Sequence, residues 1–357
     1  LVGRKRSKNS TFLFKIDSIN KPAYDRGLLA AYPPGSPFKM MNALIGLQEN
    51  IINEQTNFKC YGGYKYGPKS TDFMGCHCGI FARPIQLKTA IAKSCNSYFS
   101  NTYKRIIEMN KNPSEGADNW YKHVTSFGLG NYLGYDLPAG QKGLIPNGKY
   151  YDKRLNYRWN GSSIISNAIG QGEVLTTPIQ LANFTAAIAN KGFFYTPHIV
   201  KKIDKKPIEN LKYTTAKKTT IEAQYFTPVI EAMHEVFKTG TGRWSQVKGI
   251  EICGKTGTAE NFTRVNGFKE QLADHSILVA FAPKENPKIA LAIFVENGGY
   301  GSTIAAPITS LLIEKYLNGT ISKATKYRED KLLALSLQDI YDKQIQKPIE
   351  EIASGTK

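Results

Sequence analysis

The sequence predicts an α+β fold, in which helices come first and a sheet comes late in the chain. Two observations indicate this class. Apolar residues recur at helical spacing in segments up to about residue 190, and three apolar segments with strand character follow residue 250. With 357 residues, 41% of them hydrophobic and 21% charged, the chain is long enough to bury a sizeable core.

The helical predictions rest on periodicity and on capping residues. Residues 36–49 follow Pro33-Pro34-Gly35 and carry apolar side chains at helical spacing. A further helix is predicted after Pro84, with a break near Ser94. Residues 177–190 begin with Thr-Pro, an N-cap followed by a first-turn proline. Their almost uniformly apolar body predicts a central, buried helix.

The strand predictions fall near the end of the chain. Residues 251–261, 275–283 and 288–298 are typical of strands, and the last two, joined by the segment KENP, predict a buried antiparallel hairpin. A helix is predicted over residues 306–319. The charged stretch from about residue 320 predicts a peripheral tail.

Two segments lack periodicity, and we expect them to be irregular. Residues 56–84 are rich in glycine, tyrosine and cysteine, which predicts a long loop. Residues 110–163 alternate polar stretches with glycine and proline, which predicts ordered but irregular connections.

The formal net charge of +18, from 47 Lys and Arg against 29 Asp and Glu, bears on the class of partner. It favours an anionic membrane surface, a polyanion or a substrate with carboxylates, and it is equally compatible with a solvated basic surface. No apolar run approaches the roughly 18 residues that a membrane helix needs. Because residues 1–16 are typical of the interior of a domain, we expect a membrane anchor to lie upstream.

Ser36-Pro37-Phe38-Lys39 is an S-x-x-K tetrad at the start of the first predicted helix. Residues i and i+3 share a helix face, so the amine of Lys39 can reach the hydroxyl of Ser36. A lysine acts as a base only when it is neutral, and desolvation or a nearby cation lowers its pKa. Backbone N–H groups at the helix start can also stabilise an oxyanion. An isolated tetrad of this kind is more often an N-cap serine with a solvent-exposed lysine.

Two further motifs contain groups suited to the same chemistry. Ser94-Cys95-Asn96 offers a hydroxyl for proton relay and an amide that can hold a substrate and the Lys39 amine. Lys255-Thr256-Gly257-Thr258 places an ammonium and hydroxyls on a predicted strand, where they can bind a carboxylate. Its glycine permits the close approach of another backbone. Taken singly, each is more simply explained as a helix break or a strand edge.

Together, S-x-x-K, S-x-N and K-T-G in this order resemble the signature of penicillin-binding proteins and serine β-lactamases. From about residue 25 to 318, the sequence resembles the transpeptidase domain of class B penicillin-binding proteins. The segments YPPGSPFK, AIGQGEVLTTPIQLANFTAAIANKG and GKTGTAEN carry this resemblance. VENGGYGSTIAAPI is most similar to the elongation-specific penicillin-binding protein 2 subclass. The resemblance implies an antiparallel sheet flanked by helices, plus a mainly helical subdomain.

The resemblance implies a serine acyl-enzyme mechanism. Ser36 would attack the carbonyl of a D-Ala-D-Ala stem peptide, with Lys39 as the base. Ser94 and Asn96 would position Lys39, pass a proton and hold the substrate. An amine of a second stem peptide would then take the acyl group and form a cross-link.

The resemblance also assigns the substrate-binding groups. Lys255 and Thr256 would bind the terminal carboxylate of the stem peptide, with Thr258 contributing to that contact. Gly257 of the same motif is also assigned to substrate binding. The backbone N–H groups of Ser36 and Thr258 would form the oxyanion hole. The acyl chemistry would need no cofactor.

Location and partners follow from the same resemblance. Residues 1–320 would be the transpeptidase domain and residues 321–357 a charged C-terminal tail, with anchor and pedestal upstream. The domain would lie in the bacterial periplasm, anchored to the inner membrane, and act in cell-wall elongation. Expected partners are peptidoglycan stem peptides on a lipid-linked precursor, β-lactams and a membrane glycan polymerase; no nucleic acid is expected.

Four of the five cysteines, Cys60, Cys76, Cys78 and Cys95, cluster in the sequence. Their thiols predict a structural zinc site that ties the loop to the following helix, and some elongation-type family members resemble this in having zinc beside the active site. His77 is an alternative to Cys78 as the fourth ligand, although adjacent residues seldom bind one ion together. The competing prediction is a Cys60–Cys76 disulfide with Cys95 simply buried.

Two other functions stay open on sequence alone. A D,D-carboxypeptidase or β-lactamase would pass the acyl group to water instead of an amine, and rapid turnover of penicillin would reveal it. A non-catalytic β-lactam sensor would be acylated at Ser36 only as a signal, and a Ser36→Ala variant would then keep its cellular role.

Overall fold

The computed structural model describes residues 24–80, 83–265 and 268–337, so the expectations for residues 1–16 and for the end of the tail lie outside the described residues. The α-helices are α2 (Lys39–Gln48), α3 (Leu87–Ala92), α4 (Asn96–Ile107), α5 (Pro113–Ser126), α6 (Gly148–Arg154), α7 (Pro178–Ala189), α8 (Leu211–Thr214), α9 (Phe226–Lys238), α10 (Ala305–Asn318) and α11 (Lys326–Leu333). Short 3₁₀ helices are η2 (Ser36–Phe38), η3 (Ile165–Ile169), η4 (Ala223–Tyr225) and η5 (Arg243–Ser245). The strands are β1 (Asn57–Phe58), β2 (Tyr61–Lys65), β3 (Phe73–Ile80), β4 (Ile85–Gln86), β5 (Phe193–Phe194), β6 (Lys202–Ile203), β7 (Lys206–Pro207), β8 (Lys217–Lys218), β9 (Cys253–Ala259), β10 (Phe262–Val265), β11 (Phe268–Gln271), β12 (His275–Ala282) and β13 (Ile289–Val295).

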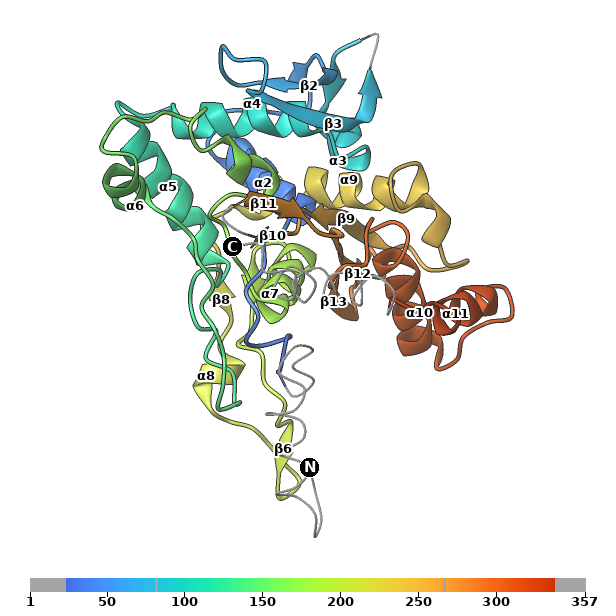
Figure 1. Ribbon diagram of the computed structural model, residues 1–357. Helices are drawn as coiled ribbons and strands as arrows, with labels where there is room; N and C mark the ends of the chain where they lie inside the picture. The colour runs from blue at the N-terminus through green and yellow to red at the C-terminus, as the bar shows by residue number, and fades with distance from the viewer. Residues whose placement is uncertain (1–23, 81–82, 266–267, 338–357) are drawn as a thin grey trace, which may run out of the picture.

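The main sheet is antiparallel, with strand order β13-β12-β9 (Figure 1). The central strand, β12, is buried along its whole length because β9 and β13 pair with its two edges and helices α7 and α10 pack against it. Val279 of β12 faces Lys255 on one side and Ala292 on the other. The three predicted strands and the predicted hairpin are confirmed.

The helical part is built around α2, which is buried from Lys39 to Leu47 and contacts α4, α5 and α9. It is preceded by η2, which packs against β9, so the prediction of a helix over residues 36–49 is confirmed. Gly257 of β9 permits this contact, since a Cβ at that position would lie 2.5 Å from Cδ of Pro37. The nucleophile candidate and the K-T-G strand are therefore in direct contact.

The predicted helix after Pro84 is broken at the expected place. Helix α3 ends at Ala92, α4 begins at Asn96, and Ser94 between them has a left-handed φ of 57°. The buried helix expected after Thr177 is also confirmed as α7. Thr177 and Gln180 form a capping box at its start.

The predicted loop over residues 56–84 is wrong. This segment holds strands β1 to β3, with β2 and β3 forming an antiparallel hairpin beside α4 (Figure 1). Burial alternates residue by residue along β3, as period two requires. The strand is difficult to recognise in the sequence because glycines such as Gly63 and Gly75, which pair across the hairpin, have no side chain to mark a face.

The predicted absence of regular structure over residues 110–163 is also wrong, because helices α5 and α6 lie there. Helix α5 begins with a proper N-cap: the Asn112 side chain accepts a hydrogen bond from the Glu115 backbone N–H at 2.9 Å. Gly116 usually argues against a helix interior. Here it allows α5 to pass the end of α4, since a Cβ would lie 1.9 Å from the Ile107 carbonyl oxygen.

The end of the described chain is partly helical. The helix predicted over residues 306–319 is confirmed as α10, and residues 326–333 of the predicted tail form α11, which packs against α10. Within residues 24–337, apart from the four undescribed positions, no helix is both long and apolar enough to cross a lipid bilayer.

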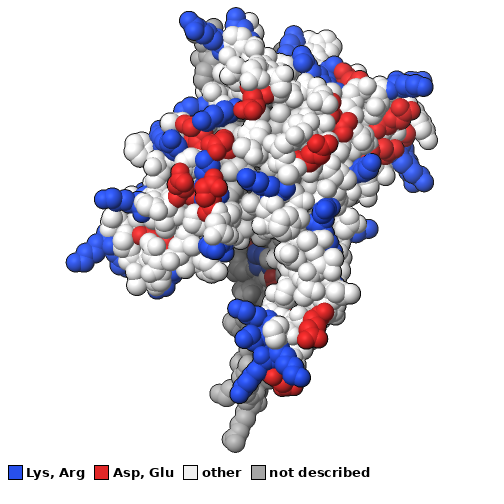
Figure 2. All heavy atoms as spheres, turned by 180° about the vertical axis from the view of Figure 1, so that it is seen from behind, with Lys and Arg blue, Asp and Glu red and all other residues white. Residues whose placement is uncertain are grey.

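Much of the excess positive charge lies on exposed side chains. The short strands β6 and β7 form part of an arm that projects from the body of the protein (Figure 1), and all four of their residues are exposed. Seen from behind, Lys and Arg side chains gather on this arm with a few acidic ones among them (Figure 2). The arm therefore carries an exposed basic surface.

Candidate active site

The three sequence motifs, which are far apart in the chain, meet at one cavity of about 660 Å³ between η2, β3, the start of α4 and β9. Their residues that line it are Ser36, Ser94, Asn96, Thr256, Gly257 and Thr258. Lys39 and Lys255 are fully buried behind these residues. All predicted catalytic and substrate-binding residues are thus brought into one region.

Lys39 is held by the S-x-N motif. Its Nζ donates to the backbone oxygen of Ser94 at 2.8 Å, to Ser94 Oγ at 3.1 Å and to Asn96 Oδ1 at 2.5 Å. The hydroxyl of Ser94 in turn donates to Ser36 Oγ at 3.1 Å. Among the described residues, no hydrogen bond joins Lys39 directly to Ser36. The expected direct contact is therefore replaced by a link through Ser94.

The environment of Lys39 favours a neutral amine. Burial lowers the pKa of Lys39 to about 8, although the negative charge of the nearby cysteine thiolates acts in the opposite direction. No carboxylate forms an ion pair with Lys39 in the part of the chain that the structure describes. A useful fraction of this amine is consequently unprotonated near neutral pH.

Lys255 is a second buried amine without a carboxylate partner among the described residues. Its Nζ donates to the backbone oxygen of Thr256 at 2.9 Å. Burial lowers the pKa of Lys255 well below its usual value, and the charge of Lys39 acts in the same direction. A carboxylate that enters the cavity would favour the protonated form of Lys255.

The K-T-G strand presents hydroxyls to the cavity. Thr256 and Thr258 are two positions apart on β9, so their side chains lie on the same face, and both line the cavity. Ser36 lies on the same cavity wall because η2 packs against β9 at Gly257. This arrangement places a hydroxyl nucleophile next to donors suited to a carboxylate.

Strand β3 holds Asn96 from the other side. The backbone N–H of Asn96 donates to Cys76 Sγ at 3.1 Å, and its Nδ2 donates to the Gly75 carbonyl at 2.7 Å. Met74, Gly75 and His77 of this strand also line the cavity. Sequence reasoning missed this wall because it treated the segment as a loop; the spacing of Cys76 and Cys78 was the available signal.

The four predicted cysteine ligands form one cluster. The Sγ atoms of Cys60, Cys76, Cys78 and Cys95 all lie within 4.8 Å of one another. Cys76 Sγ is 2.8 Å from Cys78 Sγ, which is 3.6 Å from Cys60 Sγ. All four are free thiols, so no disulfide joins Cys60 to Cys76. Hydrogen bonds from Cys78 and Cys95 lower the pKa of Cys76, which favours a thiolate there.

The geometry separates His77 from this cluster. Residues 76 and 78 of β3 share a face, whereas His77 points to the opposite, exposed face. Four sulfur ligands at about 2.3 Å from a tetrahedral zinc ion are about 3.8 Å apart. The chemistry of this donor set fits a zinc ion. The sulfur separations lie on both sides of that value, from 2.8 Å for Cys76 and Cys78 up to 4.8 Å, and the cluster contains Cys78 in place of His77.

Sequence reasoning missed a second K-T-G-T tetrad, at residues 238–241. It ends helix α9 instead of lying on a strand, but its last residue, Thr241, lines the cavity and forms a hydrogen bond with the hydroxyl of Thr256. The repetition of the tetrad was the signal that could have revealed it. Glu260, Asp274 and Tyr300 also line the cavity without having been predicted.

The fold and the site together define a protein of the penicillin-binding class. The family model for the penicillin binding protein transpeptidase domain matches residues 2–314. The chain therefore belongs to this family, and the α+β fold that the sequence predicted is confirmed.

Individual relatives refine this placement. Peptidoglycan D,D-transpeptidase MrdA of Acinetobacter baumannii is 32% identical over 302 residues, which are 81% of this chain and 43% of that protein. The crystal structure of Pseudomonas aeruginosa PBP2 in complex with WCK 5153 matches with a TM-score of 0.73 at 29% identity, over 89% of this chain and 66% of that one.

A second similar structure comes from work on the "structural coordination of polymerization and crosslinking by a peptidoglycan synthase complex". It matches with a TM-score of 0.73 at 25% identity, over 88% of this chain and 51% of that chain. The chain spans about half the length of the curated relatives that it matches.

Proposed function

We propose that the chain is the catalytic domain of a peptidoglycan D,D-transpeptidase, which cross-links stem peptides through a serine acyl-enzyme during cell-wall elongation. The observation that carries this proposal is the hydrogen-bonded series from Lys39 through Ser94 to Ser36, which ends in a cavity lined by Thr256 and Thr258. The relative MrdA and the similar structure of PBP2 support the same substrate class.

Acylation would begin with attack of Ser36 Oγ on the carbonyl carbon of the penultimate D-Ala. The proton of Ser36 passes to the Ser94 hydroxyl, whose own proton passes to the neutral amine of Lys39. A C–O bond forms and the peptide C–N bond breaks, with its nitrogen taking a proton back through the same groups. The terminal D-Ala leaves and the donor peptide remains as an ester on Ser36.

Substrate orientation would come from the β9 wall. The protonated amine of Lys255 and the hydroxyls of Thr256 and Thr258 would bind the terminal carboxylate, whose negative charge favours that protonated form. Gly257 lets η2, and with it Ser36, lie against this strand. The N–H groups of Ser36 and Thr258 stabilise the oxyanion, and each such donor is typically worth about 3 kcal/mol in the transition state.

Deacylation would repeat these steps with a different nucleophile. An amine of the acceptor stem peptide attacks the ester carbonyl, a C–N bond forms and the C–O bond to Ser36 breaks. Lys39 takes the proton of the amine, and Ser94 returns a proton to Ser36. The product is a cross-linked peptide and free enzyme.

The thiol cluster would hold a structural zinc ion through Cys60, Cys76, Cys78 and Cys95. When bound, this ion links the thiolates of separate segments and takes no part in acyl transfer. Its support for the reaction is indirect, since β3 carries two of the thiols and also contacts Asn96. The residues thus tie the hairpin β2–β3 to the first turn of α4.

Zinc content is measured on purified protein by elemental mass spectrometry. We expect about one zinc per chain in the wild type and in Cys253→Ala, whose thiol lies in the core away from the cluster. Cys60→Ser should lose the metal. A metal-free wild type whose intact mass is lower by two hydrogens would support the disulfide instead.

The wider setting is part of the same proposal. The domain would act in the periplasm, held at the inner membrane by an anchor outside this chain, on stem peptides of a lipid-linked precursor. A membrane glycan polymerase is the proposed partner; the similar structure described for polymerization and crosslinking supports it. β-Lactams would acylate Ser36, as the family's name suggests.

The function is tested by intact-mass spectrometry after incubation with benzylpenicillin, followed by peptide mapping. We expect one covalent adduct, on Ser36, that is lost slowly, and none in Ser36→Ala. Rapid release of the adduct would favour a hydrolase. Folded wild-type protein that forms no adduct at Ser36 would overturn the proposal.

A further inference from the structure

The turn that follows α9 is anchored to the segment just before the S-x-N motif. The backbone N–H of Thr241 donates to the Ala92 carbonyl at 3.2 Å. The Nζ of Lys93 donates to the Thr239 carbonyl at 2.9 Å. Because Ala92 and Lys93 directly precede Ser94, this turn has a defined position relative to the proton-relay serine.

The same turn reaches the K-T-G strand through one side chain. The hydroxyls of Thr241 and Thr256 form a hydrogen bond, and both residues line the catalytic cavity. In the described part of the chain, this is the one hydrogen bond found for the Thr256 hydroxyl. The orientation of the Thr256 hydroxyl before substrate binds is therefore set by Thr241.

The chemistry of the expected ligand decides which hydroxyl donates. A carboxylate only accepts hydrogen bonds, so Thr256 must give its single proton to it. The bond between the two threonines then has Thr241 as donor and Thr256 Oγ1 as acceptor. Because its backbone is held by Ala92, Thr241 can keep this arrangement in the absence of substrate.

We propose that Thr241 is a positioning residue of the carboxylate site: its hydroxyl donates to Thr256 and thereby directs the Thr256 proton at the carboxylate of the substrate. This inference rests on the proposed function of the cavity. It also makes the turn after α9 a connection between the relay serine and the carboxylate-binding strand.

The test compares two inhibitors that differ only in the group at issue, benzylpenicillin and its methyl ester. The second-order rate constant for acylation of Ser36 is measured by mass spectrometry for each. In Thr241→Val, which lacks the hydroxyl, we expect about a tenfold loss with benzylpenicillin and less than a twofold change with the ester. Thr241→Ser, which keeps the hydroxyl, should stay within about threefold of the wild type.

A matched control lies in the same turn. The hydroxyl of Thr239 donates to Glu235 Oε1 at 2.7 Å and not to the K-T-G strand, so Thr239→Val should leave both rate constants unchanged. Equal losses with the two inhibitors in Thr241→Val would assign Thr241 a merely structural role and overturn the inference. So would an unchanged Thr241→Val, or a Thr241→Ser as impaired as the valine variant.

The wild-type result separates this inference from the function on which it depends. Absence of labelling at Ser36 in the folded wild type would overturn the proposed function, and the inference with it. Normal wild-type labelling without the expected difference between carboxylate and ester in Thr241→Val would overturn the inference alone.

Discussion

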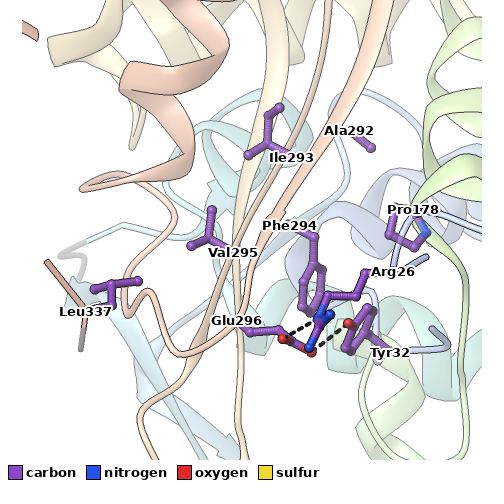
Figure 3. Close-up of a pocket in the computed structure, with 10 residues that line it drawn as sticks. Arg26, Tyr32, Pro178, Ala292, Ile293, Phe294, Val295, Glu296 and Leu337 are labelled. Atoms are coloured by element: carbon purple, nitrogen blue, oxygen red, sulfur yellow. Dashed lines mark hydrogen bonds and ion pairs between the residues drawn. The ribbon is translucent and has the colours of Figure 1, made fainter. Parts of the chain in front are cut away.

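Arg26 and Lys39 are two basic residues that lie beside cavities. Arg26 forms an ion pair with a carboxylate, whereas Lys39 has no carboxylate partner among the described residues. Arg26 lines a cavity of about 590 Å³ along β13, where its Nε lies 2.7 Å from Glu296 Oε2 and the Tyr32 hydroxyl donates to Glu296 Oε1 at 2.7 Å (Figure 3). Lys39, in contrast, donates its hydrogen bonds to uncharged oxygens in the described part of the chain.

This difference separates a structural site from a reactive one. At β13 the charge is compensated, the Tyr32 ring stacks on Phe294 at a centroid distance of 3.9 Å, and burial together with Glu296 raises the pKa of Tyr32, which keeps its hydroxyl a donor. At the catalytic cavity no carboxylate forms an ion pair with Lys39 among the described residues, and burial outweighs the nearby thiolate charge, so the proton of Lys39 is held weakly. A weakly held proton is what a serine nucleophile needs from its base.

The comparison is tested by replacing Lys39 and Arg26, one at a time, by methionine. The larger effect is expected at Lys39. Lys39→Met removes the base and should lower the acylation rate by benzylpenicillin by about 10³-fold, as loss of a general base does. Intact-mass kinetics measure the rate, and thermal unfolding checks that the variant is folded. A folded Lys39→Met with a rate within tenfold of the wild type would show that the lysine is not the base.

The pH dependence of the acylation rate tests the assignment of Lys39 further. We expect an effect smaller than that of Lys39→Met and larger than that of Arg26→Met. Only the neutral amine can accept the proton, so the acylation rate should rise up to tenfold per pH unit below a pKa of about 8 and level off above it. The rate is measured by mass spectrometry from pH 6 to 9.5. A flat profile would contradict the assignment of Lys39.

The same pKa shift has a consequence for stability. The unfolded chain holds the lysine proton up to pH about 10.4, whereas the folded protein releases it near 8. Between these values the unfolded state binds more protons, so the contribution of Lys39 to the free energy of unfolding becomes more favourable as pH rises.

Arg26→Met should have the smallest effect on the chemistry. It leaves Glu296 without this cation and should lower the free energy of unfolding by about 1 kcal/mol, because the pair is partly exposed. Acylation by benzylpenicillin should change less than twofold. Chemical denaturation and mass spectrometry measure the two quantities; a large loss of acylation would mean that the two cavities are coupled.

The sequence predictions succeeded where nearby residues alone specify a helix or a strand. Helix α7 is specified by a capping box at Thr177 and by continuous apolar residues, and β12 by an unbroken apolar run, so both were recognised. Helix α5 was missed because Gly116 suggests a break, and the reason for that glycine is the neighbouring helix α4. Its presence cannot be understood from residues 113–126 alone.

Some features of the candidate site could likewise be predicted from nearby residues, and others depend on the tertiary structure. The order and local setting of S-x-x-K, S-x-N and K-T-G are properties of the chain, because a helix start and a strand follow from nearby residues. Only the tertiary structure decided that Lys39 reaches Ser36 through Ser94, that Cys78 and not His77 joins the thiols, and that Thr241 contacts Thr256. Side-chain spacing within one element is encoded locally, whereas a contact between elements depends on how strands pair and helices pack over long separations in the chain.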